Sequence, residues 1–296
     1  FRSVEIELDY NAFKNKDWSV SVGANATFVK NKIKNLPATM KENGYISGSK
    51  KWLEGKSIYE FWLRQWHGVD PQTGDGLYVA DVSKYNQGNI GTGDGNITQS
   101  QFDEYKKTVV TIDGKELTNS YTYAKYDFSG SSIPDVFGGF NVRVSYKNFD
   151  LAAVFSYQLG GQVLDTNYAT MMSMTEFGYA QSPDLLKAWK QAGDITEVPR
   201  IDNSAAHTTN IGQSYSTRWL TSSDYLNLRS VTIGYQFPKA WLSKVMLKSA
   251  RLNLTAENLF MLKARQGLNP MANYSGVTYN EYMPSRNITL GLNVSF

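Results

Sequence analysis

The chain has 296 residues, a formal net charge of +3, 14% aromatic residues and no cysteine. The near-balanced charge gives no support to a nucleic-acid partner, and the lack of cysteine excludes disulfides. No apolar run approaches the roughly 18–20 residues of a membrane-spanning helix. The mean hydropathy of −0.41 is still compatible with a membrane β-barrel, because only every second residue of a barrel strand faces lipid.

The N-terminal residues already alternate between apolar and polar side chains. Val4, Ile6, Leu8 and Tyr10 form one stripe, and after a short polar connection at residues 14–17 the alternation continues over residues 18–28. Strands of about ten residues suit a tilted crossing of a bilayer. The pattern is running from the start of the chain and Phe1 is not an initiator methionine, so we expect a fragment of a longer protein.

The middle of the chain continues this pattern with two irregular stretches. Large apolar residues occupy both faces between residues 58 and 66, which predicts a strand that contacts a plug or a partner, or is buried on both sides. Further alternating strands are predicted over residues 140–146, 151–159, 226–235 and 251–257. The apolar phase shifts within residues 226–235, which predicts a β-bulge near Arg229.

The C-terminal residues give the clearest strand. Small or polar residues alternate strictly with an apolar stripe that ends on an aromatic residue: Ile288, Leu290, Leu292, Val294 and Phe296. A strand of a soluble sandwich can alternate equally well, but it rarely ends the chain on a bare phenylalanine. The stripe therefore favours a lipid-facing, barrel-closing strand.

The predicted connections alternate in length, as an outer-membrane barrel requires. Short ones are expected at residues 14–17, 68–75, 147–149 and 238–247, and long ones at residues 31–56, 84–138, 161–222 and 261–285. The fold class is thus all-β, with about nine antiparallel strands of a transmembrane barrel, short periplasmic turns and long external loops. Since an odd number does not close a bacterial barrel, residues 1–296 are predicted to be the C-terminal portion of a larger one, with the plug domain and first strands upstream.

Motifs for catalysis or metal binding are missing from the sequence. His67 and His207 stand in different loops without metal-ligand spacing, so we expect no enzyme activity, no metal and no cofactor. Asp94 and Gly95 resemble the centre of a calcium loop, but Ile90 and Gln101 stand where ligands belong, which favours a simple turn. Ser182 or Asp184 is predicted to cap a helical stretch that closes near Gly193.

Aromatic residues are frequent in the predicted external loops, where they could stack on sugar rings or hold peptide side chains. The alternative is that they pack loop against loop or form interfacial belts. The candidate substrate-binding residues are Trp52, Trp189, Trp219, Tyr215, Tyr274 and Tyr279, and Tyr168, Tyr179 and Tyr282 lie in the same loops.

Several short motifs carry a family resemblance over nearly the whole chain. They are Gly-Val-Asp-Pro-Gln-Thr-Gly at residues 68–74, Ser-Tyr-Lys-Asn-Phe-Asp-Leu at 145–151, Trp189 followed by Pro199-Arg200, Arg218-Trp219, Asp-Tyr-Leu-Asn-Leu-Arg at 224–229, Asn258-Leu259-Phe260 before Gly267, and the C-terminal stripe. Together they resemble the C-terminal third of SusC/RagA-type TonB-dependent transporters of Bacteroidetes outer membranes. Asn227 stands where the family usually has arginine, and residues 268–270 also depart from its pattern.

The resemblance implies a 22-stranded plugged barrel in the bacterial outer membrane. It implies energy coupling through TonB, contact with outer-membrane lipid, a SusD-like surface lipoprotein that docks on the external loops, and import of a glycan or an oligopeptide. Two other functions remain open from the residues alone: an adhesive or structural outer-membrane barrel, and a soluble carbohydrate-binding β-sandwich.

Overall fold

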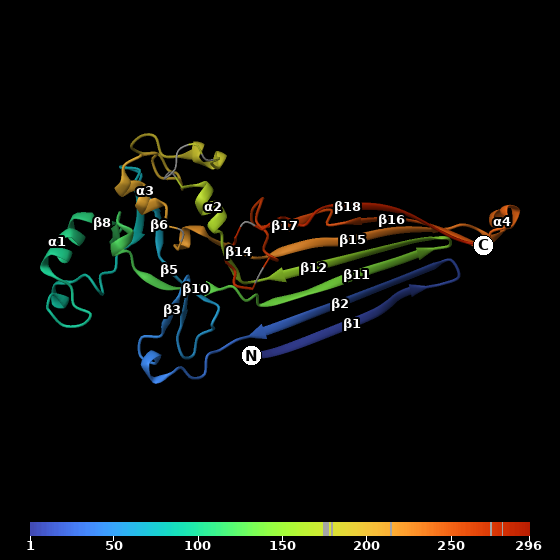
Figure 1. Cartoon of the computed structure of the whole chain (residues 1–296), viewed down its shortest axis with the longest axis horizontal. Coiled ribbons are helices and arrows are strands. Elements are labelled where there is room, and N and C mark those ends of the chain that lie inside the picture. Colours follow the sequence, from blue (N-terminus) through green and yellow to red (C-terminus); the bar gives the residue numbers. More distant parts are fainter. Residues whose placement is uncertain (174–177, 179, 214, 273, 280) are drawn as a thin grey trace.

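The structure is a computed structural model that describes residues 1–173, 178, 180–213, 215–272, 274–279 and 281–296. It combines a long antiparallel sheet, here called the wall, with a group of smaller sheets and helices, here called the loop module, at one end of the wall (Figure 1). The wall strands are β1 (Arg2–Lys14), β2 (Trp18–Lys30), β11 (Val136–Tyr146), β12 (Phe149–Leu159), β15 (Tyr225–Gln236), β16 (Ser249–Glu257), β17 (Met261–Lys263) and β18 (Asn287–Ser295).

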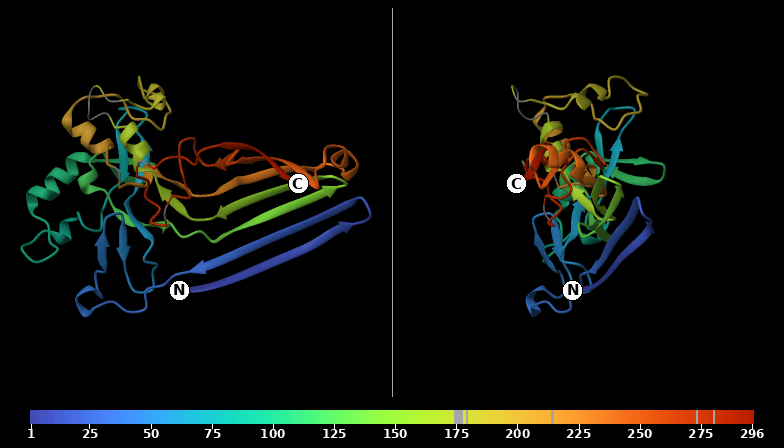
Figure 2. Two further views of the ribbon diagram at one scale, coloured as in Figure 1. Left: turned by 45° about the vertical axis from the view of Figure 1, so that its right-hand side comes forward. Right: turned by 90° about the vertical axis from the view of Figure 1, so that its right-hand side faces the viewer.

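The wall is a meander whose spatial order, β1-β2-β11-β12-β15-β16-β18, follows the chain order. The short β17 pairs with β15 through Asn227 and Met261, on the same side of β15 as β16. The described segments that join β2 to β11, β12 to β15 and β17 to β18 gather at one end of the wall, opposite the connections from β1 to β2, β11 to β12 and β15 to β16 (Figure 2). The single open sheet has no second sheet packed against its face within the described residues, which does not fit the sandwich hypothesis.

The sequence-based prediction of about nine barrel strands is too high, because the wall in the described residues has seven strands in succession and the short β17 beside them. The stretch at residues 58–66 is not a barrel strand, and residues 68–75 are not a turn between barrel strands, because both belong to the loop module. Phe61 and Leu63 are fully buried, while Trp62 on the other face contacts Tyr126 and Phe128. Burial on both faces is a property of packed sheets, whereas a barrel wall exposes one face to lipid. Residues 31–135 therefore form one excursion from the wall.

The strand registers align side chains of one kind into rows across the wall. One apolar row contains Val22, Val142, Ala153, Val231, Ala256 and Ile288. One residue along, on the opposite face, a mostly polar row contains Ser21, Arg143, Ala152, Thr232, Thr255 and Thr289. The C-terminal stripe lies on the apolar face, where Ile288 is 72% and Leu290 68% exposed. We infer that this face is covered by lipid, because apolar side chains this exposed need a nonaqueous surrounding.

The polar face of the wall also carries charges that a lipid-facing surface would exclude. Arg251 donates to Asp150 at 2.7 Å. Gly234 lies between these two strands, and a Cβ there would stand 2.2 Å from the Arg251 guanidinium. The missing side chain therefore leaves room for the ion pair to cross β15. Asp and Arg on this face fit a water-filled interior.

An aromatic belt marks the short-turn end of the apolar face. Register places Trp18, Tyr146, Phe149 and Tyr235 in one row. The rings of Trp18 and Tyr146 lie 4.3 Å apart, and those of Phe149 and Tyr235 4.5 Å apart. Such rows are typical of the interface between bilayer and water. A second aromatic contact, Phe140 with Phe155, lies on the same face nearer the loop module.

Local sequence explains the short turns and the irregularity of β15. The Asn15 side chain accepts from the backbone N–H of Asp17 and Trp18 at 2.9 and 2.7 Å, and Lys147 adopts a left-handed φ of 48°. A longer connection carries α4 (Lys239–Leu242) and the 3-10 turn η6 (Ser243–Val245). The predicted bulge is confirmed, because Val154 pairs with Ser230 and Phe155 with Leu228, which leaves Arg229 unpaired.

The loop module contains three small sheets with short helical segments between their strands. The sheets have the orders β10-β5-β4-β3, β6-β7-β9-β8 and β13-β14. Their strands are β3 (Tyr45–Ser47), β4 (Lys50–Trp52), β5 (Glu60–Arg64), β6 (Trp66–Val69), β7 (Gly76–Val79), β8 (Val109–Ile112), β9 (Lys115–Thr118), β10 (Tyr126–Ser131), β13 (Gln162–Leu164) and β14 (Leu220–Ser222). The helices are α1 (Gln99–Thr108), α2 (Thr166–Met171) and α3 (Ala205–Ile211), with 3-10 segments η1 (Ala38–Met40), η2 (Gln87–Asn89), η3 (Tyr121–Tyr123), η4 (Pro183–Lys187) and η5 (Thr217–Trp219).

The module has its own hydrophobic cores, which explains why its chain is not a set of loose loops. One core gathers residues from distant segments: Phe61, Leu63, Leu164, Ala169, Met172, Ala188, Val198, Trp219 and Val277. A smaller one surrounds Tyr105 of α1, which stacks on Tyr85 at 5.2 Å. The predicted cap at Ser182 is confirmed, but the segment is a 3-10 helix that ends at Lys187 and not near Gly193. Asp94 and Gly95 form a turn, as predicted.

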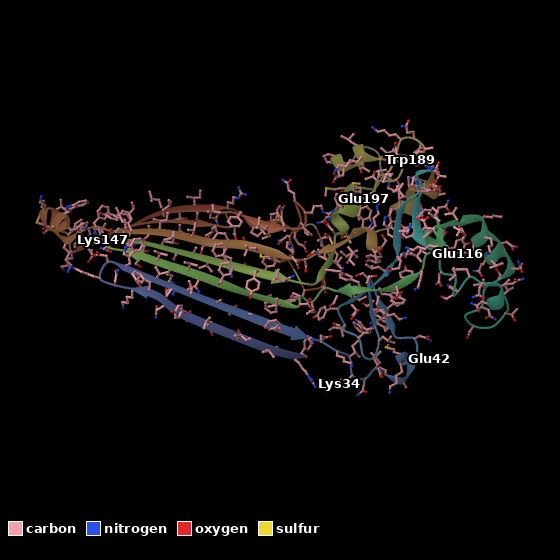
Figure 3. All side chains as sticks on the ribbon, turned by 180° about the vertical axis from the view of Figure 1, so that it is seen from behind. Lys34, Glu42, Glu116, Lys147, Trp189 and Glu197 are labelled. Carbon is pink, nitrogen blue, oxygen red and sulfur yellow. The ribbon has the colours of Figure 1, made fainter. Side chains whose placement is uncertain are left out.

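Labelled side chains in Figure 3 mark the two ends of the molecule. Figure 3 shows Lys147 at the turn end of the wall, and Trp189, Glu197 and Glu116 in the loop module at the other end. Among the described residues, no helix combines the length and the hydropathy needed to cross a membrane.

Candidate functional site

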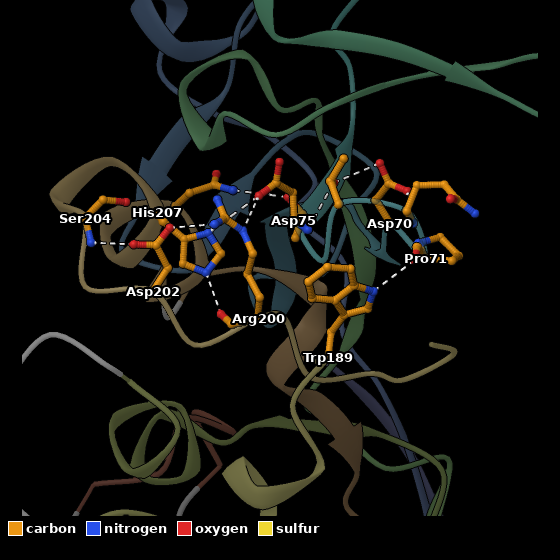
Figure 4. Close-up of polar contacts among 12 residues, drawn as sticks. Asp70, Pro71, Asp75, Trp189, Arg200, Asp202, Ser204 and His207 are labelled. Carbon is orange, nitrogen blue, oxygen red and sulfur yellow. Dashed lines mark hydrogen bonds and ion pairs between the residues drawn. The ribbon is translucent and has the colours of Figure 1, made fainter. Parts of the chain in front are cut away.

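A tight loop between β6 and β7 organises one side of the module. The Asp70 side chain accepts from the backbone N–H of Gln72 at 2.8 Å and from the Thr73 hydroxyl at 3.0 Å, and the N–H of Gly74 donates to the Asp70 carbonyl. The Trp189 indole N–H donates to the Pro71 carbonyl at 2.9 Å (Figure 4). The backbone N–H of Arg200 donates to the Gly74 carbonyl at 2.9 Å. Three motifs far apart in the sequence, at residues 68–74, at Trp189 and at Pro199-Arg200, therefore form one structural unit.

Gly74 is required at the contact between this loop and Trp189. Its φ is +73°, and a Cβ there would lie 2.4 Å from the indole ring and 2.9 Å from the Arg200 Cβ. We expect Gly74→Ala to destabilise the module by about 1–3 kcal/mol, from left-handed strain plus displacement of the ring. Protease sensitivity of residues 189–200 in the full-length protein measures this effect.

Gly95→Ala is the matched control for Gly74→Ala. Gly95 also has a positive φ, +84°, but a Cβ added there would have nothing within 4 Å. It should therefore show backbone strain alone. Equal protease sensitivity of the two variants would contradict the proposed role of the Trp189 contact.

A charged cluster lies beside the loop (Figure 4). Arg200 Nε donates to Asp75 at 3.0 Å, and its Nη1 contacts Asp202 at 2.7 Å. His207 of α3 is 7% exposed, and its Nε2 lies 2.8 Å from the Arg200 carbonyl. Because a carbonyl only accepts, Nε2 carries the hydrogen, while Nδ1 lies 3.8 Å from Asp75. The cluster joins the β6–β7 loop to α3.

A polar cavity of about 590 Å³ opens next to this cluster. Besides Asp75, Arg200 and His207 it is lined mainly by hydroxyl and amide side chains: Thr108, Asn119, Ser120, Tyr121, Ser204, Thr209 and Asn210. Such a lining can hydrogen-bond sugar hydroxyls or peptide groups. Among the described residues, the His207 ring bonds to the Arg200 carbonyl and not to the Ser204 hydroxyl. Ser204 and His207 therefore do not form a pair of nucleophile and base.

A second cavity, of about 350 Å³, lies around Arg218. The Arg218 guanidinium carbon lies 4.7 Å from the Trp66 ring centroid and 4.3 Å from that of Trp219. Its Nη1 donates to the Ile211 carbonyl at 3.1 Å. Burial lowers the Arg218 pKa to about 10. In the sequence Arg218 stands out only as part of a family motif, because its aromatic neighbour Trp66 is remote along the chain.

The predicted substrate-binding aromatics do not form one surface. Trp219 is 3% exposed and packs in the core, with its indole N–H donating to the Gln213 carbonyl at 2.9 Å. Trp189 is held by Pro71, and Trp52 contacts Tyr45 at 5.4 Å. Core packing therefore accounts for Trp219, which is the alternative that the sequence leaves open for these aromatic residues.

The tyrosines among the candidates are the exposed ones. Tyr215 is 40% exposed, and Tyr274 and Tyr279 are each 63% exposed. Tyr282 is also exposed, Tyr168 donates to Asp184 at 2.7 Å, and Tyr179 lies outside the described residues. Aromatic type alone did not separate packing residues from surface residues, since both occur in the same loops.

Lys50 is a buried cation of the module. Its Nζ lies 3.2 Å from the Phe61 ring centroid and donates to the Tyr59 carbonyl at 2.9 Å. Burial lowers the Lys50 pKa to about 7, against an opposing effect of the Glu60 charge. No cluster of three or more His, Asp or Glu residues with metal-binding geometry occurs in the described part of the chain.

The depressed pKa of Lys50 predicts a pH dependence of stability. Between about pH 7 and pH 10.5 the unfolded chain binds the Lys50 proton and the folded chain does not, so stability rises with pH across this window. The slope from this group is at most about 1.4 kcal/mol per pH unit. We expect the thermal midpoint of the full-length protein to rise more from pH 7 to pH 10 in the native form than in Lys50→Met. Identical pH profiles would contradict this.

Comparison with known proteins gives relatives along the whole chain, although no family model matches it. TonB-dependent receptor P3 of Formosa agariphila is 25% identical over 313 residues, covering 100% of this chain and 28% of the relative. TonB-dependent receptor P39 of the same organism is 24% identical over 341 residues, covering 98% of this chain and 31% of the relative. The chain thus spans less than a third of the length of these relatives.

Solved structures share the fold. The RagAB peptide transporter aligns with a TM-score of 0.74 at 22% identity, and the RagAB peptide importer in the closed-closed state with 0.75 at 24% identity. Each alignment covers 99% of this chain and 29% of the other. The relatives are named as receptors, and the solved structures as a peptide transporter or importer. Together with the two-faced wall, these matches show that the chain is similar along its whole length to a part of TonB-dependent receptors and shares the fold of a segment of RagAB, as the motifs described above predict.

Proposed function

We propose that this chain forms part of the wall and the external loops of an active importer of large oligomers, with oligopeptides as the first candidate cargo and glycans as the alternative. The observation that carries the proposal is the asymmetry of the molecule. Apolar and polar rows occupy opposite faces of the wall, and all long excursions meet at one end. This arrangement fits a barrel with short periplasmic turns and a substrate-binding module on the cell surface.

The proposal includes partners outside this chain. The solved neighbours are RagAB complexes described as peptide transporters or importers. By analogy, a SusD-like surface lipoprotein would dock on the loop module, and TonB would supply energy through a plug encoded upstream of this segment. The exposed tyrosines Tyr215, Tyr274 and Tyr279 remain our candidates for contact with cargo or lipoprotein.

Uptake in cells tests the proposal. Deletion of the full-length gene should abolish accumulation of labelled oligopeptides, or of labelled glycans in the alternative, and a protonophore should block uptake in the parent strain. Complementation with the intact gene is the control. Undiminished uptake of both cargo classes after deletion would refute import, and binding of cargo to the parent cells without accumulation would point to the adhesive function.

A further inference from the structure

Arg218 is a cation without an anionic partner in the part of the chain that the structure describes. Arg200, Arg251 and Arg265 each contact a carboxylate directly. Arg218 instead has the Ile211 carbonyl and the two indole rings of Trp66 and Trp219 as neighbours. A guanidinium offers five N–H donors, and a single carbonyl uses one of them.

The electrostatic surroundings of Arg218 are also uncompensated. Burial disfavours its charge, and the ionisable groups that act on it are the hydroxyls of Tyr78 and Tyr168. Burial raises the pKa of both tyrosines, so they are neutral near pH 7. Glu197 lines the same cavity but is an exposed residue, and within the described residues it forms no direct ion pair with Arg218. A partly buried cation in this setting is stabilised by an anion that enters from solution.

The geometry restricts what kind of anion fits. The guanidinium carbon lies over the rings of Trp66 and Trp219, and the five N–H groups of a guanidinium lie in its own plane. An acceptor must therefore approach in the plane of the guanidinium, as a carboxylate does when it binds through both oxygens. Thr196 and Thr217 also line the cavity, but the Thr196 hydroxyl donates to the Lys187 carbonyl at 2.6 Å, which leaves the Thr217 hydroxyl as the second donor beside Arg218.

The remaining lining favours a peptide over an acidic sugar. Met172 and Val198 are buried apolar residues at the cavity, and they suit the side chain of a terminal residue. A sugar ring would stack on an indole face, but Arg218 already occupies a face of each indole. The cavity, at about 350 Å³, lies at the small end of ligand pockets, which suits a chain end.

We propose that the Arg218 pocket binds the C-terminal carboxylate of a peptide cargo. This inference rests on the proposed import function and specifies how one end of the cargo is held. Arg218 is the anchoring donor, Trp66 and Trp219 hold its guanidinium in orientation, and Met172 and Val198 contact the terminal side chain. The pocket binds the C-terminal carboxylate, which all peptides with a free end share, so it is compatible with cargo of varied sequence.

The test compares free and blocked chain ends on the detergent-purified, full-length transporter complex. A randomised synthetic oligopeptide pool is offered as the free acid and as the C-terminal amide, and retained peptide is quantified by mass spectrometry. We expect the free acid to be retained about tenfold to a hundredfold better, as expected for a hydrogen-bonded charge pair. Arg218→Gln should bring this ratio close to one, whereas Arg229→Gln, which removes an exposed arginine at the bulge of β15, should preserve it.

Each outcome separates this inference from the import function. Equal retention of acid and amide by the native complex overturns the inference, while the uptake assay decides import independently. An oligogalacturonate that binds in an Arg218-dependent way, without any retention of peptide acids, also overturns it and assigns the pocket to an acidic glycan. If Arg218→Gln does not assemble, the acid-to-amide ratio of the native complex still decides.

Discussion

Trp219→Ala is expected to cost the loop module about 3–5 kcal/mol, the usual range for removing a large aromatic side chain from a core. Trp219 is 3% exposed and packs with Phe61, Leu63 and Leu164. Truncation also removes the hydrogen bond to the Gln213 carbonyl and one of the two rings beside Arg218. The module should open locally. The wall should stay assembled, because none of the described residues of this core belongs to a wall strand.

Hydrogen exchange of the full-length protein distinguishes local from global loss. We expect faster exchange in β5, β13 and α2, with unchanged protection in β11, β12 and β15. Trp241→Ala is the control, because Trp241 is 58% exposed in the connection between β15 and β16 and should change stability by less than about 0.5 kcal/mol. Unaltered exchange throughout the module in Trp219→Ala would show that this core does not hold it together.

Val142→Arg is expected to destabilise the barrel by about 2–4 kcal/mol, the cost of a basic side chain at the bilayer midplane. Val142 lies in the apolar row that ends at Ile288. This row lies midway between the aromatic row that contains Phe149 and the register pair of Gly138 with Tyr157. From residue 149 to residue 157 a strand extends roughly 26 Å along its own axis, and a tilt of about 40° reduces this to roughly 20 Å along the membrane normal, which is most of the roughly 25 Å apolar band of outer-membrane barrels.

The neighbouring Asn141→Arg provides a matched control on the same strand. Asn141 pairs with Gly23 and faces the side of the wall that carries Arg143 and Asp150. An added arginine there remains in water and should cost little. Urea-induced unfolding of the full-length barrel in lipid vesicles, followed by the gel shift of heat-modifiable barrels, measures both variants. Equal destabilisation by the two substitutions would contradict the assignment of the faces.

The wall and the loop module have different functions. The wall supplies a membrane-facing surface whose rows depend on register, and the loop module supplies cavities whose lining comes from distant segments. Arg200 and His207 connect α3 to the β6–β7 loop, while Arg218 connects η5 to β6. Cargo contact is therefore expected in the module, where polar and charged side chains gather.

The sequence by itself determined the wall. Alternation at β1, β2, β11, β12 and β18 predicted strands of nearly the observed extent, and the phase shift predicted the bulge at Arg229. This was possible because lipid on one face and water on the other impose a period of two on each strand separately. The motifs also indicated the transporter family, which the comparisons support.

Only the tertiary structure decided the organisation of the module. Apolar residues on both faces predict a strand at residues 58–66 that is buried on both sides or contacts a plug or partner, but this local pattern does not show whether the strand belongs to the barrel or to the module, so the placement of residues 58–75 in the barrel is wrong. Whether Trp189 and Trp219 pack or face solvent depended on Pro71 and on the core around Leu164, which lie far away in sequence. The cavity at Arg218 likewise exists only because β6, α2 and η5 meet, and no local pattern encodes contacts between such distant segments.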